Sequence, residues 1–306
     1  MSYTTNIKNE IINNYYTLEE NMAELSAILN IEAKIEKQHI KIYTENIGVS
    51  RRIYTLIKEI YGITPTMTKI TINRLGRRHL IELSIKEKQD FILKDLSIID
   101  ESAKRLYKPL NYLIDTDEEK KAYLRGAFMI CGSINDPKTS RYHAEFIIHN
   151  KKTAEYIAEL LKTLNYNSRV LKREKHYMVY IKEAESISDF IKLLNATNSL
   201  FYFEDIRIYR DHKNMTNRLN NCEQANIEKI INTSNIQLEN IRKLKEKVDF
   251  DLLDEKIKDI CIYKEKYPES SMQELAEIIS SETGKPITKS GINHRFRKIS
   301  EIVSKD

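Results

Sequence analysis

The sequence predicts an α+β fold in which one unit is duplicated, followed by a separate all-α unit. The duplication shows in two segments, Ala23–Ile35 and Ala122–Ile134, whose small and apolar residues agree at an offset of 99 residues, from position 23 to position 122. The same offset relates Asp90-Phe91-Ile92 to Asp189-Phe190-Ile191. After Tyr209 the character of the sequence changes, and a polar stretch leads into segments with helical patterns. A duplication of this length predicts a pseudo-symmetric domain whose halves share a central interface.

Between these segments the offset rises to 104 residues, because Asn46 and Ile53 match Asn150 and Ile157. The five added residues correspond to the loop Asn135–Thr139, which has no counterpart in the first copy. We therefore expect each copy to have the element order αββαββα. Together the copies should form a saddle whose strands make the concave face.

The first copy is expected to contain, in order, helix Leu18–Leu29, strands Lys34–Glu36 and His39–Thr44, helix Ile47–Tyr61, strands Thr66–Asn73 and His79–Ile85, and helix Lys88–Leu96. Ile53, Ile57 and Ile60 recur at the spacing of one helix face, and Gly62 supplies a stop. The later strands alternate apolar and polar residues around Leu75-Gly76-Arg77, which indicates a hairpin.

The second copy repeats this order through Glu118–Ile130, Tyr142–His149, Thr153–Asn165, Arg169–Lys175, Tyr177–Lys182 and Ile187–Leu194. The leading helices of the two copies should pack against each other along the pseudo-dyad. Small residues at Ala23, Ala27 and Gly126 would permit their close approach. An acidic cluster lies at the start of the second leading helix, where its negative charge complements the helix dipole. Its members are Asp115, Asp117, Glu118 and Glu119.

The C-terminal part is expected to contain a polar stretch Arg210–Asn221, helix Glu223–Lys247, helix Asp249–Lys266, a short capped helix, a turn Ser280–Pro286 and a basic helix Thr288–Ile302. Glu274 follows Ser271 by three residues, the spacing of a capping box. A short helix, a turn with Gly284 and a basic helix are typical of a helix-turn-helix. The predicted division of the chain is residues 1–105, 106–212, 213–248 and 249–306.

Composition excludes several classes of protein. The net charge of +5 and pI near 8.8 are only mildly basic, so the position of the charge matters more than its sum. Three separated cysteines, Cys131, Cys222 and Cys261, form neither a disulfide framework nor a zinc motif. The sequence shows no signal pattern and no apolar run long enough to span a membrane. We therefore expect a cytoplasmic, nucleoid-associated protein with no membrane, metal or other cofactor.

The basic helix carries the strongest functional pattern. At about 100° per residue, Ile292, Phe296 and Ile299 share one apolar stripe that should face a core. Arg can grip guanine, Asn can grip adenine, and Lys and Ser suit phosphates. The predicted DNA-binding residues are Lys285, Thr288, Lys289, Ser290, Asn293, His294, Arg297 and Lys298. The alternative is an ordinary amphipathic helix with a solvated basic face.

Three groups of residues resemble one family. Leu124-Arg125-Gly126-Ala127-Phe128 with Gly132–Asn135, and then Tyr142-His143-Ala144-Glu145, resemble the second repeat of the WhiA family of bacterial regulators. Asn217–Asn226 resembles its linker, and Lys289–Ile299 is similar to its terminal recognition helix. The resemblance covers essentially the whole chain. It implies a degenerate LAGLIDADG homing-endonuclease-like domain, a C-terminal helix-turn-helix, and a DNA-binding regulator tied to cell division and, in spore formers, sporulation.

The resemblance also locates the former nuclease centre. A working LAGLIDADG enzyme has an acidic residue at the end of each leading helix, and the two carboxylates hold divalent metals. Alignment on Leu124-Arg125-Gly126 puts these positions at Cys131 and Glu32. One carboxylate is missing, and hard cations need several oxygen ligands. We expect no catalytic residue, no metal and no nuclease activity.

We therefore expect a non-enzymatic, sequence-specific transcriptional regulator of cell division, chromosome segregation or sporulation that binds double-stranded DNA. The saddle would contact the DNA backbone or a partner regulatory protein. Its candidate cations are Arg51, Arg52, Arg77, Arg78, Arg169, Lys172, Arg173 and Lys175, and scattered surface charge is the alternative. A protein-interaction module, an active endonuclease and a small-ligand sensor stay open as other classes.

Overall fold

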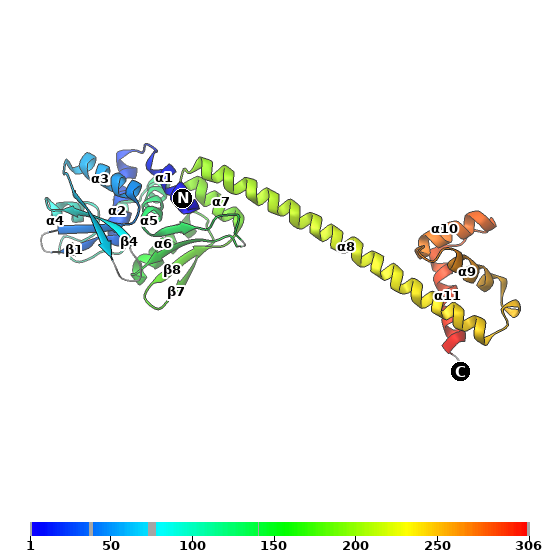
Figure 1. The fold of residues 1–306 in the computed structure, drawn as a ribbon. Coiled ribbons are helices and arrows are strands. Elements are labelled where there is room, and N and C mark those ends of the chain that lie inside the picture. The colour runs from blue at the N-terminus through cyan, green and yellow to red at the C-terminus, as the bar shows by residue number, and fades with distance from the viewer. Residues whose placement is uncertain (1, 37–38, 73–77, 140, 305–306) are drawn as a thin grey trace. The chain divides into compact units, whose positions relative to one another are not determined.

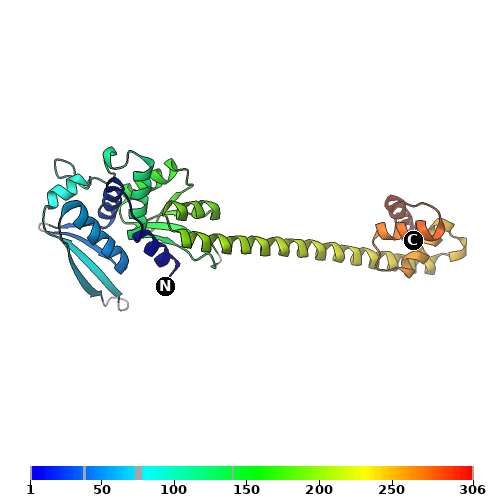
Figure 2. The same ribbon diagram turned by 90° about the horizontal axis from the view of Figure 1, so that it is seen from above.

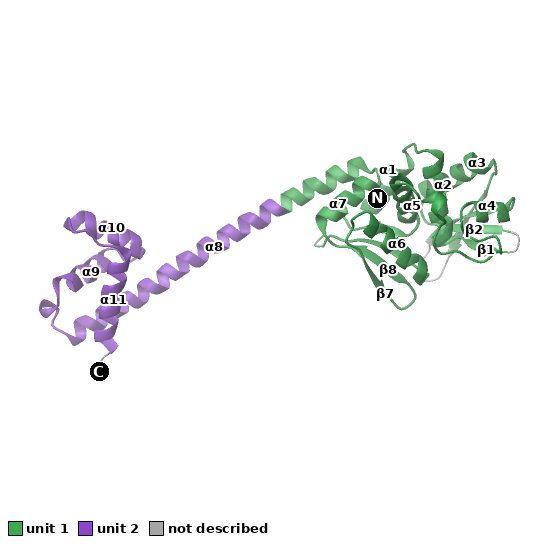
Figure 3. Ribbon diagram, turned by 180° about the vertical axis from the view of Figure 1, so that it is seen from behind, with its two compact units in different colours: residues 1–210 green, residues 211–306 purple. Residues whose placement is uncertain are grey.

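The computed structural model describes residues 2–36, 39–72, 78–139 and 141–304. The chain divides into two compact units, residues 1–210 and residues 211–306, shown in separate colours in Figure 3. Strands occur in the first unit, whereas the described residues of the second unit form helices and their connections. None of the described helices combines the length and apolar character needed to cross a membrane. The four-part division expected from the sequence stays a prediction.

Unit 1 contains the duplicated α+β domain predicted from the sequence (Figure 1). The first copy consists of α2 (Leu18–Glu32), β1 (Lys34–Glu36), β2 (His39–Thr44), α3 (Ile47–Tyr61), β3 (Thr66–Ile72), β4 (Arg78–Ile85) and α4 (Gln89–Asp95). A short 3-10 turn, η1 (Asn111–Leu113), follows. The second copy consists of α5 (Asp117–Cys131), β5 (Gly132–Ile134), β6 (Ala144–Ile148), α6 (Lys151–Thr163), β7 (Arg169–Lys172), β8 (Tyr177–Ile181) and α7 (Ala184–Leu193). The order αββαββα is confirmed in both copies.

Each copy has its own four-stranded antiparallel sheet, with the orders β1-β2-β4-β3 and β5-β6-β8-β7. Ile40 and Ile42 of β2 are fully buried, and the residues between and beside them are only partly covered. Strand β6 repeats this alternation with Ala144, Phe146 and Ile148. Because side chains alternate across a strand, one face of each sheet packs into the common core with the helices and the other face is free of them.

The hydrogen bonds that cap the helices occur at equivalent positions in the two copies. Thr17 and Glu20 form a capping box at the start of α2, and Thr116 and Glu119 form the same box at the start of α5. Asn46 caps α3 and Asn150 caps α6. Both pairs of helices therefore begin at matched positions because the same side chains satisfy the first free N–H groups.

A further helix, α1 (Tyr3–Ile12), was not expected from the sequence. It buries Tyr3, Ile7 and Ile11, whose spacing of four residues is that of one helix face. The Tyr3 hydroxyl donates to the Ser199 carbonyl oxygen at 2.7 Å. Glu10 accepts hydrogen bonds from the backbone N–H groups of Asn198 and Ser199 at 2.8 and 2.9 Å. Helix α1 thus ties the N-terminus of unit 1 to the first turn of the helix after the second copy.

That following helix, α8 (Thr197–Lys247), is one unbroken helix in Figures 1 and 2 and crosses the boundary between the units. The expectation of a polar stretch before a helix at Glu223 is wrong, because residues 210–221 are helical. No glycine or proline interrupts residues 197–247, so polarity alone does not end the helix. Its first turns are held by unit 1, where Arg210 donates to the carbonyl oxygens of Pro137 and Thr139 at 2.9 and 2.8 Å.

Unit 2 continues through η2 (Phe250–Leu252), α9 (Glu255–Lys266), α10 (Met272–Thr283) and α11 (Lys289–Ser304). The predicted capping box of Ser271 and Glu274 is confirmed. One core joins α8, α9, α10 and α11; its fully buried members include Ile241, Leu244, Ile260, Ile292 and Ile299. The predicted hairpin turn in the first copy, which spans Asn73–Arg77, lies outside the described residues.

Candidate functional site

The two leading helices meet at the pseudo-dyad with almost no space between their backbones. Ala23 and Ala27 of α2 are fully buried. A Cβ atom placed on Gly126 of α5 would lie 2.2 Å from the carbonyl oxygen of Glu24. The prediction that small residues permit this approach is confirmed. Such contact fixes how the copies sit against each other and so positions the ends of both helices.

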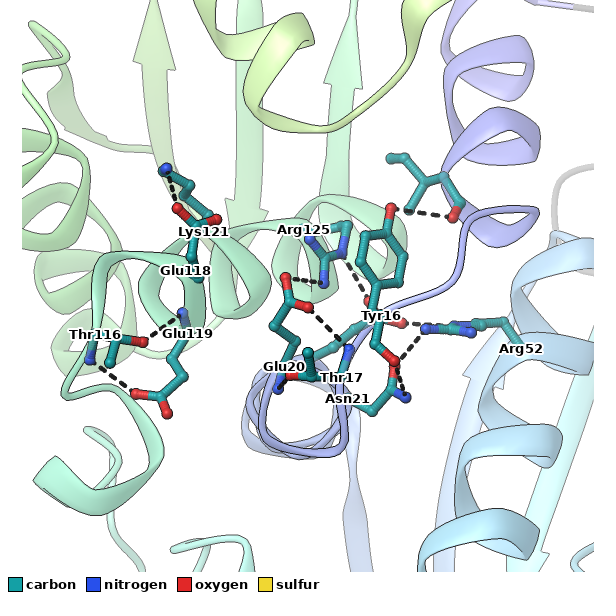
Figure 4. A network of polar contacts seen from close by, with 12 residues as sticks. Tyr16, Thr17, Glu20, Asn21, Arg52, Thr116, Glu118, Glu119, Lys121 and Arg125 are labelled. Carbon is teal, nitrogen blue, oxygen red and sulfur yellow. Dashed lines mark hydrogen bonds and ion pairs between the residues drawn. The ribbon is translucent and has the colours of Figure 1, made fainter.

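A buried ionic cluster lies beside this contact (Figure 4). The Glu24 carboxylate is fully buried and accepts from Arg125 Nε at 2.8 Å and from Arg52 Nε at 2.9 Å. The Arg125 guanidinium lies 3.4 Å from the centroid of the Tyr16 ring. The Oε1 atom of Glu20 lies 3.8 Å from Nη2 of Arg125. One carboxylate thus joins α2, α3 and α5. Sequence analysis named Arg52 as a surface cation, but the structure places it in this cluster.

Glu32 and Cys131, which sequence analysis assigned as degenerate metal positions, are the last residues of α2 and α5. Burial raises the pKa of Glu32, while His149 and Lys34 lower it. Burial raises the pKa of the Cys131 thiol to about 12, with Lys8 acting in the opposite direction. The Cys131 Sγ donates to the Ala127 carbonyl oxygen at 3.2 Å. At neutral pH the residue is therefore a thiol in a hydrogen bond and not a thiolate ligand.

Lys8 is the residue near this centre that sequence analysis missed. It projects from α1, and its ammonium lies 5.7 Å from the centroid of the Phe128 ring. Burial lowers its pKa to about 8, although Cys131 and Glu45 act to raise it. The apolar spacing within α1 could have revealed the helix, but not the position of the lysine. A protonated thiol beside an ammonium does not fit a divalent cation, which needs several oxygen ligands.

No group of three or more His, Cys, Asp or Glu residues in the described ranges is arranged to hold a metal ion. The free face of the first sheet also offers little net positive charge. Lys41 pairs with Glu36 at 3.0 Å, and the Tyr43 hydroxyl donates to Glu82 at 2.8 Å. The carboxylates of Glu36 and Glu82 thus offset part of the positive charge of this face.

The candidate cations of the second sheet do not share a face. Arg169 lies in register with Tyr180 and Glu145 on the face free of helices. Lys172 lies in register with Tyr177 and the buried Ile148, on the face that packs against the helices. Arg173 and Lys175 belong to the turn between β7 and β8. In the first copy Arg51 is exposed on α3, Arg77 lies outside the described residues, and Arg78 begins β4.

In unit 2, α10 and α11 are joined by a tight, well-bonded turn. Gly284 ends α10 in the left-handed region, with φ of 68°. The Ser280 Oγ accepts from the Ile287 N–H at 2.9 Å, which closes the turn onto α10. The Thr288 Oγ1 accepts from the Gly291 N–H at 3.2 Å and caps α11. Sequence-local bonds therefore fix where the second helix begins and which face it turns to the core.

Helix α11 separates its side chains as the sequence pattern predicted. Ile292 and Ile299 are fully buried and Phe296 is nearly so. The predicted DNA-binding residues all lie on the exposed surface of unit 2: Lys285, Thr288, Lys289, Ser290, Asn293, His294, Arg297 and Lys298. Arg295 differs, because its Nη1 donates to the Lys256 carbonyl oxygen at 3.2 Å. Arg295 is therefore held by the fold, whereas the Arg297 side chain has no partner among the described residues and can bind a ligand.

The fold and these two sites define a class of protein: a duplicated LAGLIDADG-like domain followed by a helix-turn-helix unit. Three family descriptions match the chain: WhiA N-terminal LAGLIDADG-like domain at residues 18–99, WhiA LAGLIDADG-like domain at 120–213, and WhiA C-terminal HTH domain at 216–303. The chain belongs to the WhiA family.

Similarity to individual relatives extends along the entire chain. A protein of Ligilactobacillus salivarius named "Probable cell division protein WhiA" is 38% identical over 100% of this chain and 97% of its own length. The protein of the same name from Bacillus cytotoxicus is 41% identical over 92% of this chain and 90% of its own length. The crystal structure of full-length DUF199/WhiA from Thermatoga maritima matches with a TM-score of 0.59 at 20% identity, covering 100% of this chain and 99% of that one. This last comparison supports the fold.

Proposed function

We propose that this chain is a sequence-specific DNA-binding protein that regulates transcription through helix α11. The observation that carries the proposal is the polar face of α11, which stays exposed while the opposite stripe packs on α8, α9 and α10. A helix presented in this way after a short capped helix can enter the major groove. In this arrangement double-stranded DNA is the ligand, and the bases are read by side chains on one helix.

The side chains divide by chemistry into readers and positioning groups. Asn293 and Arg297 can make paired hydrogen bonds to adenine and guanine, and Ser290 and His294 flank them on the same face. Lys285, Lys289 and Lys298 would hold phosphates. Thr288 acts at the helix start, where its hydroxyl already caps α11 and the remaining N–H groups favour a phosphate.

The process regulated is inferred from the family. The relatives named above are called cell division proteins, and we propose a related role here, in cell division, chromosome segregation or sporulation. A regulator of this kind would act in the cytoplasm at the nucleoid.

We further infer that the LAGLIDADG-like domain has lost nuclease chemistry. Cys131 stands where the metal-binding aspartate belongs and is a hydrogen-bonded thiol, while Lys8 places a cation close to it. A lone Glu32 opposite these groups lacks the second carboxylate that two-metal cleavage needs. The domain would then serve as a scaffold and not as an enzyme.

One observation favours a second role for this scaffold as a platform for a partner protein. On the free face of the second sheet, Ile147 and Leu171 are 42% and 45% exposed and lie in register on either side of Met178. An apolar row of this kind suits a protein contact better than a phosphate backbone. The candidate partner is a regulatory protein.

The experiment that tests the proposed function is footprinting of the full-length protein on its own genomic DNA. Discrete protected sites that share a sequence motif would support a specific regulator. Uniform or absent protection, together with capture of a protein by unit 1, would instead favour the interaction module. Magnesium-dependent cuts that disappear in Glu32→Gln would favour the endonuclease.

A further inference from the structure

A cleft of about 560 Å³ lies inside unit 2, next to the start of the proposed recognition helix. Three segments form its walls: helix α8, the stretch from Lys264 in the last turn of α9 to the first turn of α10, and the first residue of α11. Its lining includes Lys229, Gln237, Lys264, Met272, Gln273 and Lys289. The sequence could not reveal this site, because it combines three segments that are far apart in the chain.

The lining contains three lysines and no carboxylate side chain. Lys229 and Lys289 are exposed, and neither makes an ion pair in the part of the chain that the structure describes. Lys264 is 2% exposed and donates to the carbonyl oxygens of Pro268 and Ser270, both at 2.9 Å. An ammonium has three donors, so these two bonds leave one. The cleft therefore presents concentrated positive charge with no acidic group in its wall.

The N-terminus of α10 adds backbone donors to the same cleft. Ser271 accepts from the Glu274 N–H, and the Glu274 carboxylate accepts from the Ser271 N–H. The N–H groups of Met272 and Gln273 have no acceptor among the described residues, and both residues line the cleft. Free N–H groups and the positive end of a helix dipole together favour a phosphate.

Gln237 is an independent indication that the cleft takes a ligand. Its side chain reaches the cleft from α8 and is only 7% exposed. Throughout the described ranges it makes no side-chain hydrogen bond. Its amide atoms stay accessible within the cleft, so a ligand or water bound there can complete their hydrogen bonds.

We propose that this cleft binds a phosphate group of the DNA backbone, and that α8 is therefore part of the DNA interface. This inference rests on the proposed function of α11. Lys289 connects the two, because it lines the cleft and directly precedes the proposed base reader Ser290. None of the lining side chains is aromatic, so a free nucleotide would find no ring on which to stack its base. A phosphate of the duplex bound by α11 fits better.

The test uses the full-length chain and a duplex carrying the footprinted site, alongside a scrambled duplex. Dissociation constants are measured by fluorescence anisotropy at several salt concentrations for the wild type, Lys229→Gln, Gln237→Glu and Arg297→Ala. Lys243→Gln is the matched control, since Lys243 lies on the same helix outside the cleft and pairs with Glu239 at 2.7 Å. Circular dichroism melting of each variant checks that unit 2 is intact.

We expect Lys229→Gln to reduce the slope of log affinity against log salt by about one unit on both duplexes. Gln237→Glu should weaken binding to both through charge repulsion, and Lys243→Gln should keep the wild-type slope. Wild-type slopes for Lys229→Gln, while Arg297→Ala still loses specific binding, would overturn the cleft assignment and leave the proposed function standing. No specific binding by any form would overturn both.

Calorimetric titration with pyrophosphate and with ATP separates the two sources of phosphate. Weak or absent binding of both compounds agrees with a site completed only by DNA. If either compound binds tightly in a Lys229-dependent manner while the DNA slope is unchanged, the cleft serves a small phosphate ligand and the assignment to DNA is wrong.

Discussion

Gly126 of α5 rests directly on the backbone of Glu24 in α2, so that a single added carbon would lie 2.2 Å from the Glu24 carbonyl oxygen. A contact with backbone cannot be relieved by turning a side chain. The close approach of the two leading helices therefore depends on the absence of a side chain at one position.

Gly126→Ala should lower the free energy of unfolding of unit 1 by about 3 kcal/mol, because the helices must separate to admit the methyl group. Hydrogen exchange followed by mass spectrometry reports the two units separately. Gly291→Ala is the control, since its added Cβ would lie 3.3 Å or more from its neighbours. That change should stay within about 1 kcal/mol. Equal protection of α2 and α5 in wild type and Gly126→Ala would contradict the packing.

Breaking the buried cluster should be more costly than breaking a surface pair. Arg125→Met leaves the fully buried Glu24 with one cation fewer, and the expected loss is about 3–5 kcal/mol. Lys121→Met, which removes an exposed pair with Glu118 on the same helix, should change stability by less than about 1 kcal/mol. Urea unfolding of unit 1 measures both. Similar losses for the two variants would show that the Glu24 cluster carries no special weight.

Thiol reactivity should follow burial. Burial raises the pKa of Cys131 to about 12 and that of Cys261 to about 11, so at pH 8 both are almost fully protonated thiols. Since the thiolate is the nucleophile, alkylation of the folded protein should modify the exposed Cys222 first. Peptide mass spectrometry of timed samples identifies the order. The expected order would fail if Cys131 reacted as fast as Cys222 before unfolding.

Purified protein should not cut DNA when magnesium or manganese is supplied. The reason is the pairing of Glu32 with a protonated thiol in place of a second carboxylate. Supercoiled plasmid carrying the footprinted site is incubated with each metal and resolved on a gel. Glu32→Gln distinguishes contamination from activity. Cleavage by the wild type that Glu32→Gln removes would establish a working nuclease centre.

Features set by neighbouring residues could be predicted from the sequence. The duplication correctly predicted the order of elements because equivalent helices are capped by equivalent side chains, such as Asn46 and Asn150. The capping box of Ser271 and Glu274 and the apolar stripe of α11 depend on spacings of three or four residues. All residues of such a pattern lie within one or two turns of a helix, so the sequence alone reveals it.

Features set by distant residues could not be predicted. From the sequence alone Arg52 resembles any exposed cation. Only the fold brings it to Glu24. Lys8 comes near Cys131 because α1 packs on α3 of the first copy and on α5 and β5 of the second. The phosphate cleft likewise needs Lys229 and Lys289 to meet from separate helices. In each case the chemistry depends on a contact across tens of residues, which no local spacing records.

The most direct test of the account compares Arg297→Ala with Lys298→Ala in full-length protein, using specific and scrambled duplexes. Arg297→Ala should lose about 1–3 kcal/mol of specific binding while its binding to the scrambled duplex hardly changes. Lys298→Ala should weaken both duplexes alike and reduce the salt slope by about one unit. Unchanged affinity of Arg297→Ala for the footprinted site would contradict the assignment of α11 as the reading helix.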